Sequence, residues 1–263
     1  MLVRDAGDSW QIVLQTDHGR LAGDFARAWA ERPEHSSSME LVADRHDDGW
    51  FIWEQAPNLD REGRPCGYLD VRVTSHIAFF RAMIEAVTEQ DPYAGLIASM
   101  HGAGIYRNRY GLQDSLRMSL AGDVRELVES FVQGEEKSHP VRMAELGVSE
   151  EERWRAYKLL QVWDQLSLYA SLNDLESGDP DSPALTYVSI PSAPLNGEEL
   201  TMTLRPDGPL RTIVDPYPFG SEPVKFTLPR RRIAMRDWRD PDEFREDFHA
   251  AEVEQLTFEM APA

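Results

Sequence analysis

The sequence predicts a mainly helical fold with a strand-rich C-terminal region, α+β overall. Apolar residues such as Leu21 and Phe25 recur at helical spacing through the first two-thirds of the chain. From Leu185 onward, short apolar runs are separated by Pro and Gly, which is typical of strands. The 263 residues are 41% hydrophobic, enough to bury a substantial core. We therefore expect a helical domain over residues 1–178 and a strand-rich region over residues 179–263 that packs on it.

Start and stop signals divide the first two-thirds of the chain into six expected helices. Thr16 or Asp17 can cap the first, and residues 37–40 have the spacing of a capping box for the second. Ser149 opens a long sixth helix in which Asp164 lies among apolar residues. The expected helices run from Asp17 to before Pro33, from Ser37 to about His46, from Thr74 to Gln90, from Asp91 to a glycine-rich end at residues 101–104, from Asp123 to Gln133, and from Ser149 to a break at Ser177.

The strand-rich region should contain five short strands. Each is an apolar, partly β-branched run bounded by turn residues. A further short apolar segment, Gln11 to Leu14, leads into the first helix. The expected strands are Leu185 to Ile190, Leu200 to Leu204, Thr212 to Val214, Val224 to Leu228, and Val253 to Phe258.

Composition excludes several classes of protein. A formal net charge of −19 repels a phosphate backbone and argues against a broad nucleic-acid-binding surface. Cys66 is the single cysteine, so an intramolecular disulfide and a thiolate zinc cluster are excluded, and we expect an ordinary loop residue there. The first residues lack a signal-peptide pattern, and no apolar run approaches the roughly 20 residues that span a bilayer. We expect a cytoplasmic protein that does not insert into membranes.

The seven histidines fall into two groups. His35, His139 and His249 lie in polar surroundings, and we expect all three to be solvated surface residues. The other four lie at the ends of separate expected helices, where they can converge on one point. Asp47 directly follows one of them, and the buried carboxylate expected at Asp164 needs a partner, because an unpaired buried charge costs several kcal/mol. Imidazole and carboxylate together favour Fe, Mn, Zn or Ni over Ca or Mg. The predicted metal ligands are His18, His46, Asp47, His76, His101 and Asp164.

The order of these six residues resembles the HD-domain superfamily of metal-dependent hydrolases, named for its His-Asp doublet. The resemblance covers roughly residues 15 to 170. It implies a helical bundle in which His18, His46, Asp47 and Asp164 hold a first metal. Asp47 would bridge to a second metal, held also by His76 and His101. It implies two divalent ions, with Fe or Mn foremost and Zn or Ni as alternatives.

One branch of that superfamily, the HD-GYP phosphodiesterases, is similar around the doublet. Asp47-Asp48-Gly49 continues it in the same way, but Trp50 stands where that branch usually has Lys. The phosphate contact of that branch is therefore not carried over to this chain, and the resemblance indicates an uncharacterised bacterial branch instead.

Three functions are compatible with these residues. The first is a phosphohydrolase or phosphodiesterase for a small phosphoester, with Asp47 at the catalytic centre and Arg107 and Arg109 as clamps for phosphate oxygens. Arg20 and Arg45 also flank predicted ligands and could do the same. The second is a mixed-valent di-iron oxygenase, because the inositol and organophosphonate oxygenases of the superfamily have a similar ligand order. The third is a non-catalytic metal-binding interaction module. A small-molecule substrate is the expected partner, and a homo-oligomer stays open.

Overall fold

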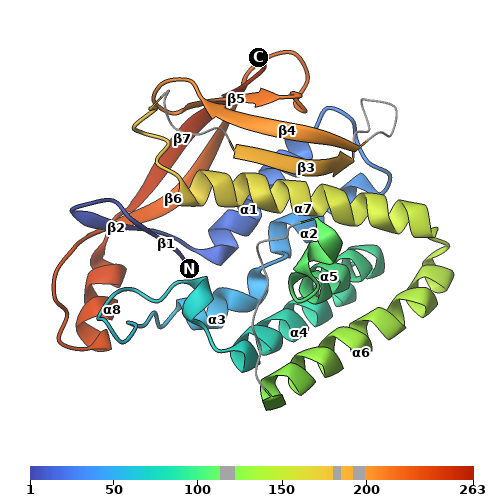
Figure 1. The fold of residues 1–263 in the computed structure, drawn as a ribbon, viewed down its shortest axis with the longest axis horizontal. Coiled ribbons are helices and arrows are strands. Elements are labelled where there is room, and N and C mark those ends of the chain that lie inside the picture. Colours follow the sequence, from blue (N-terminus) through green and yellow to red (C-terminus); the bar gives the residue numbers. More distant parts are fainter. Residues whose placement is uncertain (113–121, 180–184, 192–198) are drawn as a thin grey trace.

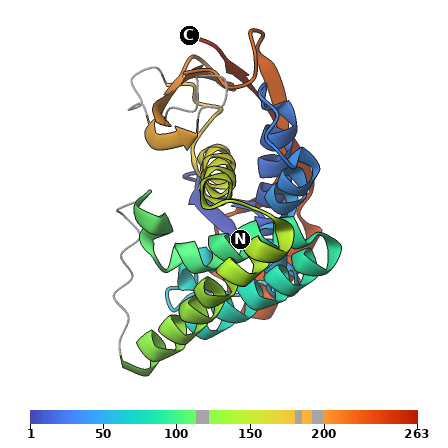
Figure 2. The same cartoon turned by 90° about the vertical axis from the view of Figure 1, so that its right-hand side faces the viewer.

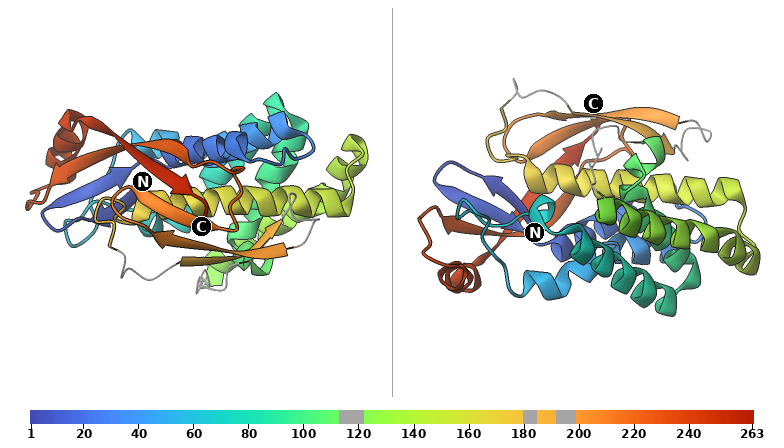
Figure 3. Two further views of the ribbon diagram at one scale, coloured as in Figure 1. Left: turned by 90° about the horizontal axis from the view of Figure 1, so that it is seen from above. Right: turned by 60° about the horizontal axis from the view of Figure 1, so that its bottom comes forward.

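The computed structural model describes residues 1–112, 122–179, 185–191 and 199–263, and within them one seven-stranded sheet curves over a layer of helices (Figure 1). Figure 2 looks along the helix α7 (Glu150–Leu172) and shows strands curving over it. In Figure 3 the first strands of the chain lie beside the C-terminal strands. The expected mainly helical α+β fold is confirmed.

The sheet joins the two ends of the chain. Its order is β1-β2-β6-β7-β5-β4-β3, and neighbours are antiparallel except β5 and β7, which are parallel. Helix α7 contacts β1 and β3, the two opposite edges, because the sheet curves around it. The strands are β1 (Leu2–Asp5), β2 (Ser9–Val13), β3 (Leu185–Pro191), β4 (Glu199–Pro206), β5 (Arg211–Asp215), β6 (Val224–Ala234) and β7 (Val253–Ala261).

Local signals start several of the helices. The Asp91 carboxylate accepts a hydrogen bond from the Ala94 N–H at 2.9 Å, and Ser149 does the same for Glu152 at 3.1 Å. Besides α7, the helices are α1 (Gln15–Ala28), α2 (Ser36–Arg45), α3 (Phe51–Glu54), α4 (Val73–Gln90), α5 (Pro92–Ile105), α6 (Gly122–Leu146) and α8 (Pro241–Ala250), with short 3-10 turns η1 (Asp48–Trp50), η2 (Tyr68–Asp70) and η3 (Asn108–Gly111).

The helices and the sheet share a large hydrophobic core, and a second, smaller cluster joins β2, β6 and α8. Phe25 of α1 packs on Phe226 of β6 with ring centroids 4.5 Å apart. Trp29, just after α1, packs edge-on against Trp163 of α7 at 5.9 Å. A boundary at residue 178 therefore does not separate the sheet from the helices, since β1 and β2 lie in the expected helical region and belong to the sheet. None of the described helices is both long and apolar enough to cross a bilayer.

Two helices extend past their expected ends because packing overrides local signals. Helix α5 continues past His101 to Ile105, so His101 lies inside a helix and not at its end. Gly104 serves close packing, because a Cβ there would lie 2.2 Å from the Tyr157 hydroxyl. Helix α6 continues through Pro140 to Leu146, where packing against α5 outweighs the missing N–H.

At the chain ends and helix starts, the structure differs from the expectation in three details. The pair β1–β2 and helix α8 were not expected, although Gln11 to Leu14 overlaps β2. Helix α1 is not capped by Thr16 or Asp17, because the Glu54 carboxylate accepts the Gln15 N–H at 2.6 Å. The capping box expected for α2 does not form either, since no side chain caps that helix.

Candidate metal centre

A cavity of about 140 Å³ lies between the helices and brings most of the predicted ligands together. Its walls come from α1, α4, α5 and α7 and from the segments that follow α2 and α5. The wall has an apolar part, which includes Trp50, Val73, Phe80 and Leu168. Its polar residues are Gln15, His18, Asp47, Tyr68, His76, His101, Arg109 and Asp164.

Two imidazoles face each other through Nε2: His18, which lines the cavity, and His46, which is fully buried beside His18. Nδ1 of His46 lies 2.8 Å from the Ala43 carbonyl oxygen, which only accepts, so Nδ1 carries the proton. The Ser167 hydroxyl gives its hydrogen to the Asp164 carbonyl at 2.8 Å and therefore accepts from Nδ1 of His18 at 2.6 Å. With both Nδ1 atoms protonated, the two Nε2 atoms face each other 3.1 Å apart. Such a contact is favourable only when a proton or a metal ion lies between the two Nε2 atoms.

Two carboxylates complete this acceptor set. From Nε2 of His18, Asp47 Oδ2 and Asp164 Oδ1 are each 3.4 Å away. From Nε2 of His46 the same oxygens lie at 3.8 and 3.6 Å. All four side chains are buried. Nitrogen and oxygen atoms at this spacing could hold a divalent transition metal.

The electrostatics of the cluster keep both carboxylates ionised. Burial alone would raise the pKa of Asp47, but His46 and His18 outweigh it and lower the pKa to about 2. Burial is likewise outweighed at Asp164, where Arg109 and His46 hold the pKa well below its usual range. Burial would lower the pKa of His46, yet Asp47 and Asp164 raise it to about 9. The cluster therefore attracts positive charge, which a proton or a metal ion can supply.

His101 belongs to a hydrogen-bond chain along one side of the cavity. Arg109 Nη1 donates to Asp164 Oδ2 at 2.5 Å and to the side-chain oxygen of Gln161. A guanidinium only donates, so the amide nitrogen of Gln161 is the atom that faces His101 Nδ1, at 3.2 Å. Burial, with the charge of His46, lowers the pKa of His101 to about 3. His101 is therefore neutral with its proton on Nε2.

His76 lies on another wall of the cavity. Its ring packs against Trp50 and Phe80, with centroids 5.2 and 4.5 Å away, and its Nδ1 is 3.0 Å from the Tyr106 hydroxyl. Burial lowers its pKa to about 4. The two buried groups of mutually close ligand atoms contain His18, His46, Asp47, His101 and Asp164. His76 is in neither group and is only a lining residue of the cavity.

A family comparison covers all of these residues. The family described as "Protein of unknown function (DUF3891)" matches residues 1–235. The chain belongs to this family. No curated protein and no solved structure matches the chain. In this DUF3891 chain, the role of the site must therefore be argued from its own geometry.

The predicted arginines are distributed unevenly. Arg109 is buried and lines the cavity. Arg107 was expected beside it but lies elsewhere, because its guanidinium pairs with Glu129 at 2.9 Å and Glu136 at 3.2 Å on α6. The two flanking arginines also take outer partners, Arg20 with Asp17 at 3.0 Å and Arg45 with Asp48 at 3.8 Å.

The three histidines expected on the surface differ in their exposure to solvent. His35 and His249 are exposed, as expected. His139 is 3% exposed, and the expectation for it was wrong. It is buried because Ser99 and Arg153 both hydrogen-bond its ring, which replaces the water that a surface histidine would contact.

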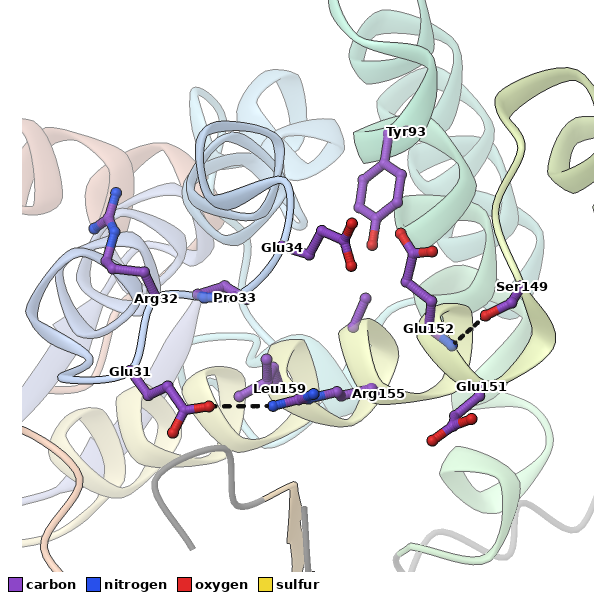
Figure 4. A pocket seen from close by; sticks show the side chains of 11 residues that line it. Glu31, Arg32, Pro33, Glu34, Tyr93, Ser149, Glu151, Glu152, Arg155 and Leu159 are labelled. Atoms are coloured by element: carbon purple, nitrogen blue, oxygen red, sulfur yellow. Dashed lines mark hydrogen bonds and ion pairs between the residues drawn. The ribbon is translucent and has the colours of Figure 1, made fainter. Parts of the chain in front are cut away.

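Figure 4 shows a separate pocket of about 350 Å³, where Glu34, Tyr93 and Glu152 point toward one another. His35 joins Glu34 and Glu152 there in a group of possible metal ligands. This group differs from the buried cluster because His35 is 45% exposed and its Nε2 already pairs with Glu152 at 3.3 Å. Arg155 and Glu31 of this pocket also pair with each other, at 3.4 Å.

Two residues of the centre escaped the sequence analysis. Gln161 and Ser167 stand three positions before and after Asp164, so all three share one face of α7. This spacing around a buried carboxylate was a usable signal. Their partners, the Arg109 guanidinium and the His18 ring, come from distant segments and could not be read from that spacing.

Proposed function

We propose that this chain is a metal-dependent phosphohydrolase or phosphodiesterase that hydrolyses a small phosphoester in the cavity, as the resemblance to the HD-domain superfamily implies. The observation that carries the proposal is the pair of Nε2 atoms 3.1 Å apart, flanked by two ionised carboxylates. His18, His46, Asp47 and Asp164 would hold a first divalent ion. Asp47, with His76 and His101, would hold a second.

Each of these residues would have a separate role in hydrolysis. A divalent transition metal bound there supplies a water of lowered pKa and polarises a phosphoryl oxygen. Asp47 stays ionised at neutral pH, so it can hold a cation and orient an attacking water. Arg109 presents a permanently charged guanidinium that can bind phosphate oxygens. Ser167 and the Ala43 carbonyl fix the ring orientation of the two histidines, as outer hydrogen-bond partners of metal ligands do.

The cavity also restricts the substrate class. Its volume of about 140 Å³ and its apolar wall around Trp50, Phe80 and Leu168 suit a compact ester with an apolar part. A long nucleic acid is disfavoured by the net charge of −19. We therefore propose a small phosphorylated molecule as the substrate. Imidazole and carboxylate ligands favour Fe or Mn, with Zn or Ni as alternatives.

The test combines metal content with turnover. Protein purified without chelators should contain a transition metal by elemental analysis. After removal and readdition of Mn or Zn, it should hydrolyse bis-p-nitrophenyl phosphate under anaerobic conditions, and His46→Ala should lose both metal and turnover. A folded protein that binds no transition metal would overturn the proposal.

A mixed-valent di-iron oxygenase is the second candidate, and the aromatic residues around His76 favour it. Trp50, Phe80 and Tyr106 pack on or hydrogen-bond this ring and could shield a redox-active iron. This candidate predicts a mixed-valent iron signal by electron paramagnetic resonance and oxygen consumption on addition of a polyol or phosphonate. Metal-dependent hydrolysis without oxygen would reject it.

A further inference from the structure

The hydrogen-bond chain from Arg109 to His101 has a direct consequence for metal binding. A metal-ligating imidazole must offer an unprotonated nitrogen. The Gln161 amide nitrogen occupies Nδ1 of His101, so the ring proton lies on Nε2. In this arrangement His101 presents an N–H to the cavity and cannot act as a ligand through that nitrogen.

We infer that Arg109, acting through Gln161, decides whether His101 donates a hydrogen bond or binds a second cation. An anion that draws the guanidinium away from Asp164 and Gln161 would open the second cation site. This inference rests on the proposed function, because it concerns a second cation beside the four-residue centre. Arg109 and Gln161 are positioning residues in it.

The alternative arrangement is chemically balanced. Once Arg109 leaves, Gln161 can turn its side-chain oxygen toward His101. The ring then loses a proton from Nε2 and gains one at Nδ1, with no net change, and Nδ1–H donates to Gln161. Nε2 becomes a lone pair that faces the cavity.

The backbone of η3 is consistent with such a movable arginine. Asn108, Arg109 and Tyr110 have φ values of 51°, 50° and 54°, a left-handed conformation that residues with a Cβ rarely adopt. Because Arg109 lines the cavity together with His101 and Asp164, an anion bound there can reach its guanidinium.

Linkage makes the effect reciprocal. If an anion raises the affinity for the second cation, the second cation raises the affinity for the anion by the same factor. Substrate binding would then complete the centre. The chain would hold one cation at rest and two only with an anionic group in the cavity.

The first experiment measures Mn²⁺ binding by equilibrium dialysis, with and without inorganic phosphate. We expect one tight site in the wild type and a second whose affinity rises roughly 10-fold with phosphate, within the usual range of coupling. In Gln161→Glu, the carboxylate can still accept from Arg109, but it has no N–H to donate to His101. His101 must then donate from Nδ1, which leaves Nε2 unprotonated, so this variant should bind the second ion without phosphate. The matched control is Gln165→Glu, a buried Gln one turn further along α7, which should behave like the wild type.

The second experiment locates the ring proton of His101 directly and needs no metal. In ¹⁵N-histidine-labelled protein with a chelator present, NMR should show His101 protonated at Nε2 in the wild type and at Nδ1 in Gln161→Glu. Phosphate-independent binding of two ions by the wild type, or an equal effect of Gln165→Glu, would overturn the inference and leave the hydrolase proposal standing. Absence of any tight Mn²⁺ site would overturn both, and an Nδ1-protonated His101 in the wild type would overturn the inference alone.

Discussion

Helix α5 contributes side chains to two buried histidine clusters, one at the cavity and one around His139. They are built from similar side chains and differ in whether all the ring nitrogens have hydrogen-bond partners. At the cavity, Nε2 of His18 and Nε2 of His46 face each other and the carboxylate of Asp164. Around His139, the Ser99 hydroxyl donates to Glu135 at 2.7 Å and accepts from the ring Nε2 at 2.9 Å.

The other nitrogen of His139 is satisfied as well. Nδ1 faces the Arg153 guanidinium at 3.3 Å, which can only donate. Every lone pair of this ring meets a donor, so the cluster is complete without an ion. Burial of a histidine therefore does not by itself indicate a metal site, and the proposed site differs because its nitrogen and oxygen atoms face one another.

The largest expected effect tests the cavity side of this comparison. Asp47→Asn removes a charge from the acceptor set, and we expect Mn²⁺ affinity to fall by more than about 100-fold, since loss of even an outer partner costs roughly 10–100-fold. His101→Ala should weaken only the second ion. Equilibrium dialysis with elemental analysis measures both. His139→Gln is the control and should bind metal like the wild type; equal loss in the control would contradict the distinction between the clusters.

The second effect tests the complete cluster. His139→Leu leaves the Arg153 donor and the Ser99 oxygen without their partner, and an unmet buried polar group costs about 1–3 kcal/mol. We expect a loss of that size in the free energy of unfolding, measured by urea denaturation with a chelator present. The exposed His249→Leu should change it by less than about 0.5 kcal/mol. Equal losses in the two variants would show that the His139 bonds contribute nothing.

The two clusters should also respond differently to acid. Burial, with the charges of Arg153 and Arg142, lowers the pKa of His139 to about 4, below its ordinary 6.5. Between these values the unfolded chain binds a proton that the folded chain does not, so stability is full above 6.5 and falls as the pH decreases toward 4. The loss at about pH 5 is roughly 2 kcal/mol.

His139→Gln separates this effect from general acid destabilisation. A glutamine amide can still accept from Arg153 and donate to Ser99, but it does not titrate. The variant should therefore lose less stability than the wild type between neutral pH and about pH 5. Parallel stability curves for the two proteins, measured by urea denaturation with a chelator, would contradict the assigned cause.

The sequence predicts which helices carry the candidate ligands better than it predicts the hydrogen bonds that orient those ligands. Capping residues and apolar stripes are local, so the starts of α5 and α7 and the place of Asp164 within α7 follow from spacing. The end of α5 does not, because Gly102 and Gly104 look like a stop and in fact allow close packing. The direction of a lone pair depends on partners far away in the chain, as with Ser167 and His18, and no local pattern contains it.

The same limit applies to the two arginines that the sequence analysis paired. Arg107 and Arg109 are two positions apart, but the left-handed turn sends one to α6 and the other into the cavity. Sequence proximity to a ligand predicted both as phosphate clamps. Only the backbone conformation distinguishes them, and a run of three left-handed residues without glycine is not predictable from composition.

The smallest expected effect, that of Arg107→Gln, is also the sharpest test of this division. Its guanidinium is 33% exposed and pairs with two glutamates of similar exposure, so its loss should cost about 0–1 kcal/mol of stability. Because it lies outside the cavity wall, inorganic phosphate should inhibit Arg107→Gln and the wild type at the same concentration. Arg109→Gln should need a higher phosphate concentration, since it removes the charge that faces the bound anion. If Arg107→Gln weakened phosphate inhibition as much as Arg109→Gln, the clamp would include both arginines, and the α6 ion pairs would have to open during binding.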